Sequence, residues 1–478
     1  METTSTMKAR VLIKSCAVCA SGRIRHDFFN NGDPVCQCED CGFMFLNPQP
    51  AEQGTMRPGP APCKAAERLY AALLRDYCGF ARGSLLQVGS GEGGVDFSAL
   101  HNINVSYAEL DTASYDAAPF AAPATSFDVC CMFDCLQKAR SPEKLLLAIR
   151  DRLKPGGTLL LTAPSLNRYS VWRGIQTWTG FAAGNFYFFD EQSLQSILFK
   201  CGFRDIYAVK DPCSGESMAV LAQKRPLRAK PLLSIILPVY NEAATFPKLY
   251  AMLKEKQLPG ADKEIVIVES NSTDGTRDAV KAVSADAGVK AVFEERPRGK
   301  GHAVRTGLKN ATGDFVLIQD GDLEYDLDDY DRLLEPLLSF RRAFVLGSRH
   351  SNGWKMRHFT DQPLVAFLLN LGHIFFAYLL NLFCGTALKD PFTMYKVFRR
   401  DCLYGLSLKA NRFDFDWELV IKLIRKGYVP LELPVSYHAR SFDEGKKISF
   451  IKDPVFWIIA LFRFRFCRLH ENIGRHKA

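Results

Sequence analysis

The chain has 478 residues, of which 47% are hydrophobic and 24% charged, so most of it can bury a core and a disordered chain is excluded. At roughly 100–200 residues per domain, this length predicts two to four domains. The formal net charge of +9 fits phosphate-bearing partners or an anionic membrane surface without choosing between them, and we expect no nucleic-acid partner.

The first residues and the cysteines bear on the compartment. Met1 is followed by polar residues rather than the apolar run of a secretory signal. Fifteen cysteines in a chain of this length do not predict a disulfide framework. We therefore expect a reducing, cytoplasmic environment.

Residues 1–50 carry two cysteine pairs, Cys16-Ala-Val-Cys19 and Cys38-Glu-Asp-Cys41. Four thiolates in the pattern C-x2-C-x18-C-x2-C suit tetrahedral zinc, with each pair on a tight knuckle. The spacing predicts a structural zinc module, for which Cys36 is not needed. Buried thiols are one alternative. A redox pair is less favoured, because neither C-x-x-C opens a helix after a strand.

Residues of about 66–224 alternate strand-like and helix-like runs. "LLQVGSGEGG" (85–94) is an apolar strand with a glycine-rich turn, whose Gly89 and Gly91 let backbone amides approach a ligand. Glu109 ends the next strand-like run, where an acid can bond a ribose diol. "FDVCCMFDCLQ" and "LLLAIRDRLKPGGTLLLTAP" then give a strand, a helix, a Lys-Pro-Gly-Gly turn and a strand.

These stretches resemble class I S-adenosylmethionine methyltransferases, and the cysteine module is similar to the zinc module that often precedes such domains. The resemblance implies S-adenosylmethionine bound near Gly89, Gly91 and Glu109. The stretch between Asp111 and Phe127 is short, however, where the family has a helix and a strand. A degenerate domain that only binds or scaffolds is the alternative.

Residues 225–232 contain two prolines and three cations and predict a linker. A second alternation begins with "SIILPVY" and runs over about 233–450, followed by a basic and aromatic tail over 451–478. Two such alternations predict two Rossmann-like α/β domains, each with a mostly parallel sheet.

The stretch "IQDGDLEYDLDDYD" (318–331) crowds acids behind an apolar strand. Asp320 and Asp322 alternate around Gly321, so both can face one magnesium or manganese ion, and Glu324 can complete its shell. Gly321 is expected to let a ligand approach these acids. The four acids from Asp326 to Asp331 are expected to form a solvated helix start.

Four segments occur in order: "SIILPVYNEAATFPKL", "EIVIVESNSTDGTRDAV", "RPRGKGHAVRTGLKNATGDFVLIQDGDLEYD" and "FVLGSRH". They resemble family-2 glycosyltransferases of the GT-A fold, most closely the dolichyl-phosphate mannosyltransferase-like group. The resemblance implies an inverting, metal-dependent transfer from a nucleotide-sugar to a polyprenyl phosphate or a glycan. It implies donor-binding roles for Pro238, Tyr240, Glu242, Glu269, Arg298, Lys300 and Arg349.

The same resemblance extends to "DPFTMYKVFRRD" and "RFDFDWELVIKLIRKGY". Asp416 and Glu418 are the candidate carboxylates near the acceptor, where a neutral hydroxyl needs a general base and a lipid phosphate needs none. Arg440, Lys446 and Lys447 suit an anionic acceptor or a closing loop.

Residues 364–388 are apolar and long enough to span a bilayer. A single crossing would separate Lys396 and Asp416 from Asp320, which should share one site. A polar-to-small stripe also recurs at helical spacing, comprising Asn370, His373, Ala377, Asn381 and Cys384. With the tail at 453–466, this predicts peripheral association with the cytoplasmic face of a membrane. A buried helix or a dimer interface is the alternative.

Three functions remain open at this stage. The first is the glycosyltransferase. The second is a bifunctional methyltransferase and glycosyltransferase acting on a glycan or glycolipid. The third is a non-catalytic binding scaffold, which the intact Asp-Gly-Asp and Gly-Ser-Arg motifs disfavour.

Overall fold

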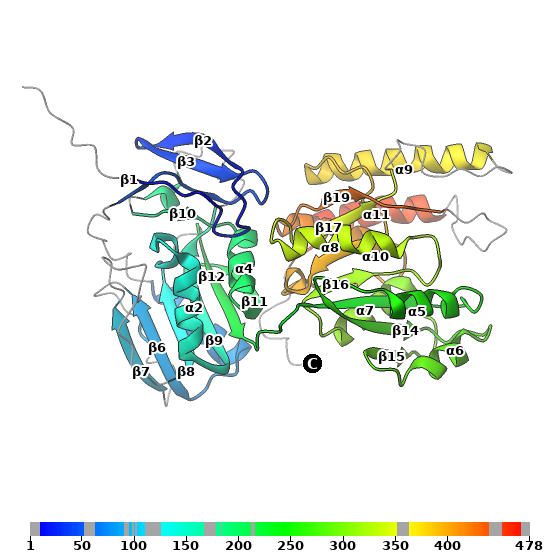
Figure 1. The fold of residues 1–478 in the computed structure, drawn as a ribbon, viewed down its shortest axis with the longest axis horizontal. Helices are drawn as coiled ribbons and strands as arrows, with labels where there is room; N and C mark the ends of the chain where they lie inside the picture. The colour runs from blue at the N-terminus through cyan, green and yellow to red at the C-terminus, as the bar shows by residue number, and fades with distance from the viewer. Residues whose placement is uncertain are drawn as a thin grey trace, which may run out of the picture. The chain divides into compact units, whose positions relative to one another are not determined.

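The computed structural model describes residues 10–51, 63–89, 95–97, 100, 103–109, 126–166, 178–182, 184–211, 216–350, 363–438 and 452–469. Two compact units divide between Leu227 and Arg228. Each unit contains a mostly parallel sheet with helices packed on it, which confirms the predicted α/β class (Figure 1).

The cysteine-rich segment forms a small antiparallel sheet in the first unit. Its strand order is β10-β4-β3-β2, and β1 pairs separately with β5. Its elements are β1 (Arg10–Val11), β2 (Ile24–Asn30), β3 (Asp33–Cys38), β4 (Met44–Leu46), β5 (Gln49–Pro50) and β10 (Tyr187–Phe188). Because β10 comes from far along the chain, this sheet is joined to the α/β part of the unit and is not a separate module.

The larger sheet of the first unit has the order β11-β12-β9-β8-β6-β7, with β6 to β9 parallel. Its strands are β6 (Gly83–Gly89), β7 (Ile103–Glu109), β8 (Phe127–Phe133), β9 (Leu153–Pro164), β11 (Phe203–Lys210) and β12 (Ser217–Lys224). The helical segments are α1 (Lys64–Ala72), η1 (Leu73–Tyr77), η2 (Leu136–Lys138), α2 (Pro142–Arg152), η4 (Thr179–Phe181) and α4 (Glu191–Lys200).

The expected Lys-Pro-Gly-Gly turn before β9 is instead part of that strand. Phe127 pairs with Leu153 and Val129 with Thr158, so the intervening residues form a bulge in β9. Gly156 has a φ of +76°, a value that favours glycine and lets the bulge form without a break.

The second unit contains a seven-stranded sheet of order β15-β14-β13-β16-β18-β17-β19, in which β18 runs antiparallel to β16 and β17. The near-continuous apolar run of β13 is buried, as expected for a strand covered on both faces. The strands are β13 (Leu232–Val239), β14 (Asp262–Glu269), β15 (Val289–Phe293), β16 (Phe315–Ile318), β17 (Phe344–Ser348), β18 (Lys396–Arg399) and β19 (Leu431–Pro434).

Seven helices and two 3-10 segments accompany this sheet in the described part of the unit. They are α5 (Phe246–Glu255), α6 (Thr276–Val283), α7 (Lys300–Asn310), η5 (Leu327–Asp329), α8 (Tyr330–Leu338), α9 (Pro363–Cys384), η6 (Arg400–Leu403), α10 (Asp414–Arg425) and α11 (Lys452–Phe466). The carboxyl ends of β13 to β16 share one edge of the sheet, because these strands are parallel.

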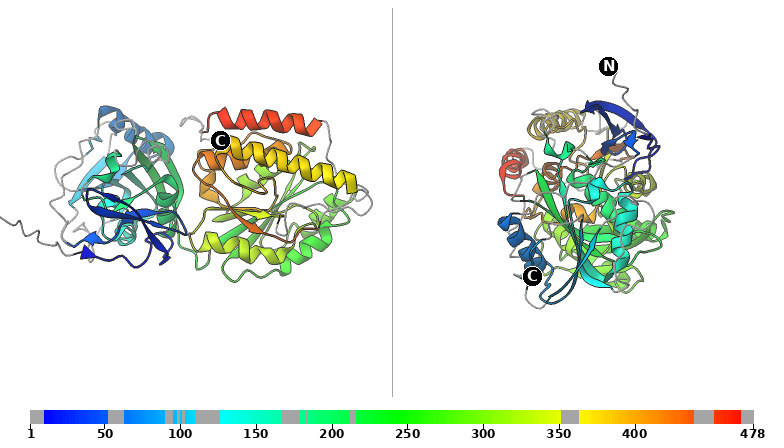
Figure 2. Two further views of the ribbon diagram at one scale, coloured as in Figure 1. Left: turned by 90° about the horizontal axis from the view of Figure 1, so that it is seen from above. Right: turned by 90° about the vertical axis from the view of Figure 1, so that its left-hand side faces the viewer.

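Helices α9 and α11 lie side by side (Figure 2). The polar-to-small stripe of α9 faces its own unit: His373 and Ala377 are buried, and Asn381 bonds the backbone of Leu388. The opposite face is apolar and exposed, and comprises Phe367, Leu371, Phe375, Tyr378 and Leu382. Ile458, Ile459, Phe462 and Phe466 are exposed on α11.

Among the helices of the described residues, none combines the length and the hydropathy that a bilayer crossing requires. We call the two exposed apolar stripes together the α9–α11 face.

Candidate active site

Asp320 and Asp322 lie directly after β16, at the carboxyl edge of the second sheet. Asp322 is 7% exposed, and its Oδ1 accepts a hydrogen bond from the Glu324 amide at 3.1 Å. Asp320 forms an ion pair with Lys300, the first residue of α7. Burial disfavours the charge of Lys300, but Asp320, Asp416 and Asp322 outweigh it and raise the lysine pKa. This strand end therefore stabilises a cation.

Gly321 packs against the end of β13, where the first expected nucleotide contacts lie. A Cβ at this position would meet Val239 Cγ1 at 3.1 Å and the Pro238 carbonyl at 3.4 Å. The Thr245 hydroxyl lies 2.9 Å from the Gly321 carbonyl and 3.0 Å from the Glu242 carboxylate. Because β13 lies close beside Gly321, the glycine allows close packing at this point, and the approach of a sugar past Gly321 stays a prediction.

Two predicted donor contacts lie at the surface. Tyr240 is 39% exposed at the end of β13, and Arg298 is exposed in the loop before α7. Lys300 follows Gly299, whose φ of +99° favours glycine. A Cβ on Gly301 would lie only 2.8 Å from the Ala410 carbonyl, so glycine allows the start of α7 to pack on that loop.

Glu269 ends β14 and is fully buried. Its Oε1 accepts a hydrogen bond from the Ser272 amide at 2.6 Å, and its Oε2 pairs with Arg277 at 2.5 Å. Both carboxylate oxygens thus have partners in the same chain. A nucleobase contact by Glu269 stays a prediction.

A second buried acid, Glu294, is not predicted from the sequence. Its carboxylate accepts a hydrogen bond from the Ser270 hydroxyl at 2.7 Å and lies 2.6 Å from His302 Nδ1. Ser270 and Glu294 follow neighbouring parallel strands, so they meet at the edge that carries Asp320. The position of His302 two residues after Lys300 was the available signal in the sequence.

Asp416, near the start of α10, completes the charged cluster. Its Oδ1 accepts a hydrogen bond from Lys396 Nζ at 2.8 Å. Lys396 is fully buried, and burial lowers its pKa even though Asp416 opposes the shift. Because Lys300 interacts with both Asp320 and Asp416, the cluster joins residues that precede and follow α9.

Glu418 does not face this cluster through any described contact. Its carboxylate accepts hydrogen bonds from the Lys409 and Ala410 amides at 2.8 and 2.7 Å, and pairs with Lys422 at 2.5 Å. Glu418 therefore holds the loop that packs on the start of α7. Glu324 also has a partner in its own chain, since the Tyr437 hydroxyl donates to its carboxylate at 2.8 Å.

Arg349 is paired with Asp390 through two parallel bonds. Its Nε and Nη2 lie 2.8 Å from the two carboxylate oxygens, and its backbone amide donates to Oδ2 at 2.9 Å. Burial alone raises the pKa of Asp390, but Arg349 outweighs it and holds that pKa well below its ordinary range. A phosphate contact by Arg349 stays a prediction.

The remaining acids of residues 318–331 serve the fold. The Asp326 side chain caps η5 by accepting a hydrogen bond from the Asp328 amide at 2.9 Å. Asp328 and Asp331 both pair with Lys256, at 3.1 and 3.2 Å. Asp329 accepts a hydrogen bond from the Ser436 amide at 2.7 Å. Their contacts are those of a helix start, but only Asp326, Asp328 and Asp331 are solvated as predicted, because Asp329 is buried.

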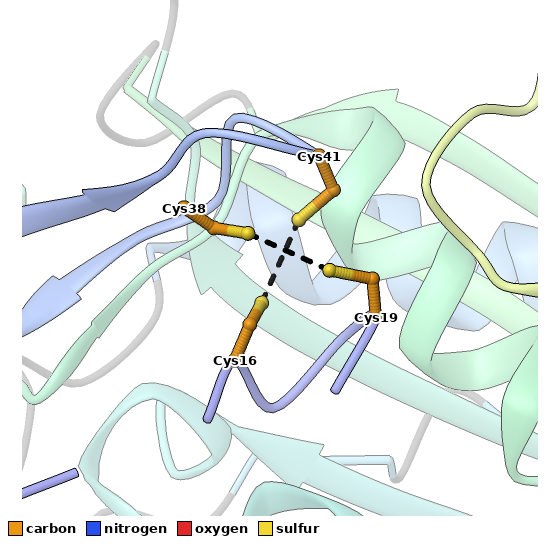
Figure 3. A group of neighbouring side chains, drawn as sticks. All are labelled: Cys16, Cys19, Cys38 and Cys41. Carbon is orange, nitrogen blue, oxygen red and sulfur yellow. Dashed lines mark hydrogen bonds between the residues drawn. The ribbon is translucent and has the colours of Figure 1, made fainter. Parts of the chain in front are cut away.

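The four cysteines of the predicted zinc module converge (Figure 3). Cys16 and Cys41 have sulfur atoms 3.5 Å apart, as do Cys19 and Cys38. A tetrahedral zinc with bonds of about 2.3 Å would hold sulfurs about 3.8 Å apart, so the arrangement fits such an ion. The described cysteines are otherwise free thiols, except that Cys63 is disulfide-bonded and departs from the expectation.

The predicted cofactor residues of the first unit are only partly described. Gly89 ends β6 and Glu109 ends β7, on the same edge of the sheet. Gly91, the Glu109 side chain, most of the stretch between Asp111 and Phe127, and the cations Arg440, Lys446 and Lys447 lie outside the described residues.

The fold and the site define a two-domain α/β enzyme with carboxylates and lysines gathered at one strand edge. Residues 234–406 match the family described as "Glycosyl transferase family 2". Residues 62–208 match "Methyltransferase domain". The second unit therefore carries a family-2 glycosyltransferase domain, and the first unit carries a methyltransferase domain.

The chain is 27% identical over 214 residues to Dolichol-phosphate mannosyltransferase of Pyrococcus furiosus, covering 45% of this chain and 58% of that protein. It is 25% identical over 231 residues to Glycosyltransferase AglJ of Haloferax volcanii, covering 48% and 70%. The chain thus spans little more than half the length of the first of these relatives. The structure of glucosyl-3-phosphoglycerate synthase from Mycobacterium tuberculosis with Mn²⁺, UDP-glucose and phosphoglyceric acid matches with 23% identity and a TM-score of 0.36, over 50% of this chain and 80% of that one.

Proposed function

We propose that this chain is an inverting, metal-dependent glycosyltransferase that moves a sugar from a nucleotide-sugar to a polyprenyl phosphate. The observation that carries the proposal is the cluster after β16, where Asp320 and Asp322 meet Lys300 and Asp416. The family-2 match supports sugar transfer. The relative named Dolichol-phosphate mannosyltransferase supports a lipid phosphate as the acceptor.

Asp320 and Asp322 are the proposed metal ligands. Their carboxylate oxygens are the hard donors that magnesium and manganese prefer, and the position of Lys300 supports a site that accepts positive charge. When bound, the ion would offset the negative charge that develops on the leaving nucleotide. Glu324 is the proposed third ligand, and its bond to Tyr437 orients it.

The donor is held by residues at the same sheet edge. Tyr240 and Arg298 are exposed, and we assign them to contacts with the nucleotide and its phosphates. Lys300 pairs with Asp320 in the structure and would pair with the diphosphate when the donor is bound. The full proposed donor set is Pro238, Tyr240, Glu242, Glu269, Arg298 and Lys300.

The acceptor side favours an anion over a neutral hydroxyl. Lys396 Nζ donates a hydrogen bond to Asp416 Oδ1 at 2.8 Å, so this oxygen is already engaged and is not free to take a proton from an acceptor hydroxyl. A phosphate needs no base, because it is already ionised. Arg349 is the proposed phosphate contact, whereas Glu418 positions the loop under α7.

A transfer assay with matched acceptors tests this proposal. Nucleotide-sugars are screened with manganese against a short-chain polyprenyl phosphate and the corresponding polyprenol. We expect transfer to the phosphate alone. Equal transfer to the polyprenol, or transfer only to a glycan hydroxyl, would replace the lipid phosphate with a neutral acceptor.

The α9–α11 face is the proposed membrane contact, at the cytoplasmic face of a bilayer. The exposed stripe of α9 is apolar, and its polar stripe bonds the rest of the second unit. A helix that faces water has the opposite arrangement, with polar residues outside and apolar residues inside. Arg463 and Arg468 are exposed on or just after α11 and complement anionic lipid headgroups. This face therefore fits a lipid surface and a lipid-linked acceptor.

Leu371→Glu with Phe375→Glu should reduce binding to anionic vesicles by at least about 100-fold. Both side chains are more than half exposed, so the fold should tolerate the change, while each lost apolar contact removes about tenfold in affinity. Vesicle flotation measures binding, and high salt should release the wild type. Met252→Glu, at an exposed apolar position on α5, is the control. Unchanged flotation of the double variant would remove α9 from the interface.

The cysteine cluster is a proposed structural zinc site. Because the ion would tie the two cysteine pairs together, chelation should unfold residues 10–51 and expose the four thiols to a thiol reagent. Zinc release should track modification of Cys16, Cys19, Cys38 and Cys41. Cys36→Ser, beside the cluster but outside it, should leave zinc in place. Four thiols that react freely with no zinc released would refute the site.

A second candidate function is methyl transfer by the first unit. The methyltransferase match favours this function. Polar side chains also lie after two strands of the first unit: Asp134 follows β8, and Asp211 follows β11 and accepts a hydrogen bond from Tyr70. The short stretch after Asp111 nevertheless predicts weak or absent binding of S-adenosylmethionine. Calorimetry checks this, and a low-micromolar dissociation constant would contradict the expectation and make the bifunctional enzyme the better account.

A further inference from the structure

Three buried side chains converge beside Arg349 and do not include the proposed metal ligands Asp320, Asp322 and Glu324. They are His350 after β17, His373 in the middle of α9 and Asp390 before β18. Each is less than a tenth exposed, at 7%, 7% and 0%, and their ligand-type atoms lie within 4.8 Å of one another. Neither the family matches nor the donor site accounts for this cluster.

The carboxylate of Asp390 has one position that faces the histidines. An ionised carboxylate offers about four lone-pair positions. Arg349 uses two on Oδ2, through its amide and Nε, and one on Oδ1, through Nη2. At the fourth lone-pair position, Asp390 Oδ1 lies 3.6 Å from His373 Nε2.

The distance between Asp390 Oδ1 and His373 Nε2 can be compared with that of a direct hydrogen bond and with that of two ligands sharing a metal ion. A distance of 3.6 Å is too long for a hydrogen bond between nitrogen and oxygen. Two ligands that each sit about 2.0–2.2 Å from a shared zinc ion are separated by roughly 3.3–3.7 Å. The Lys389 carbonyl also lies 3.2 Å from the same nitrogen, and one ring proton cannot serve both oxygens.

The second histidine brings another nitrogen donor to the same point. The rings of His350 and His373 have centroids 4.8 Å apart and are tilted by 46°. Two protonated imidazoles this close would repel each other, whereas two neutral imidazoles can share one cation. Glu432 adds negative charge nearby, since its carboxylate accepts hydrogen bonds from the Lys389 and Asp390 amides.

We propose that His350, His373 and Asp390 form a second metal site, for a borderline divalent ion such as zinc. Imidazole ligands select zinc or cobalt, whereas the carboxylates after β16 suit magnesium or manganese. The ion would link α9 to the segment after β17 and to the segment before β18, and so would close the chain between His350 and Asp390 into a loop. This site would hold the inner side of the helix whose outer side is the α9–α11 face.

Metal analysis of the full chain tests the site. The protein is saturated with zinc in excess magnesium, which occupies the donor site, and then freed of loose metal. We expect two zinc ions per chain in the wild type and one in His373→Gln. His438→Gln, an exposed histidine outside the cluster, should keep two. The difference of one ion does not depend on whether the cysteine site or the transfer reaction is as proposed.

Two further readouts keep the result clear if a variant is unstable. Cobalt in the wild type should give visible ligand-field bands from this site and sulfur charge-transfer bands from the cysteines. His350→Gln should lose only the former. Zinc should raise the melting temperature of the wild type by about 5 °C more than that of His373→Gln. Equal zinc counts in wild type and His373→Gln, or unchanged cobalt bands in His350→Gln, would overturn the site.

Discussion

Asp322→Asn should reduce sugar transfer by at least about 100-fold. The substitution keeps the side-chain volume and removes the charge that the proposed metal ion needs. Because that ion offsets charge that develops on the leaving nucleotide, the loss falls on the transition state, where a single such contact is worth roughly 3–4 kcal/mol. The measurement is the initial rate of transfer at saturating manganese and donor.

Stability provides the contrast that separates catalysis from folding. The sequence alone suggests that Asp322→Asn relieves repulsion between two carboxylates and slightly raises stability without metal. In the structure Lys300 already neutralises Asp320, so we expect an unchanged melting temperature. Asp328→Asn is the matched control, because it changes an 88% exposed acid of the same stretch. Near-normal transfer by Asp322→Asn, or full activity in excess chelator, would mean that the metal site lies elsewhere.

The parts of the fold that the sequence predicts are those with strong local patterns. The continuous apolar runs of β13, β14 and β16 read as buried parallel strands, because each is covered on both faces. The pairing of β10 with β4 has no local signature, since it joins segments far apart in the chain. The sequence predicts a turn where β9 has its bulge, because a glycine such as Gly156 in a positive-φ conformation suits both a turn and a bulge.

The candidate site also contains features with a local sequence pattern, which can be predicted, and features without one. Asp320 and Asp322 could be found from the sequence, since two acids around a glycine at a strand end have few structural uses. Lys396 and Asp416 could be expected near Asp320, but their 2.8 Å hydrogen bond could not, because it joins two segments that no sequence pattern places side by side. Glu269 and Glu418 are both predicted site carboxylates, and the sequence does not show that both also accept hydrogen bonds from backbone amides of their own chain.

Asp390→Asn should lower the melting temperature of the second unit by about 10 °C, measured in chelator so that no metal contributes. The change leaves the Arg349 guanidinium, 9% exposed, without its carboxylate. Leaving one buried charge uncompensated costs roughly 3–5 kcal/mol. Replacing both partners with apolar residues, as in Arg349→Met with Asp390→Leu, should recover most of this loss.

The pH dependence gives the same pair an independent signature. Arg349 holds the pKa of Asp390 well below its ordinary value, so the pair stabilises the fold above the unfolded pKa of about 4. That contribution is lost as the pH falls below about 4 toward the folded pKa. Asp390→Asn has no proton to bind, so its stability deficit relative to the wild type should shrink over this acidic range. A deficit that stays constant down to the acid unfolding of the wild type would mean that packing, and not the charge of Asp390, stabilises this part of the second unit.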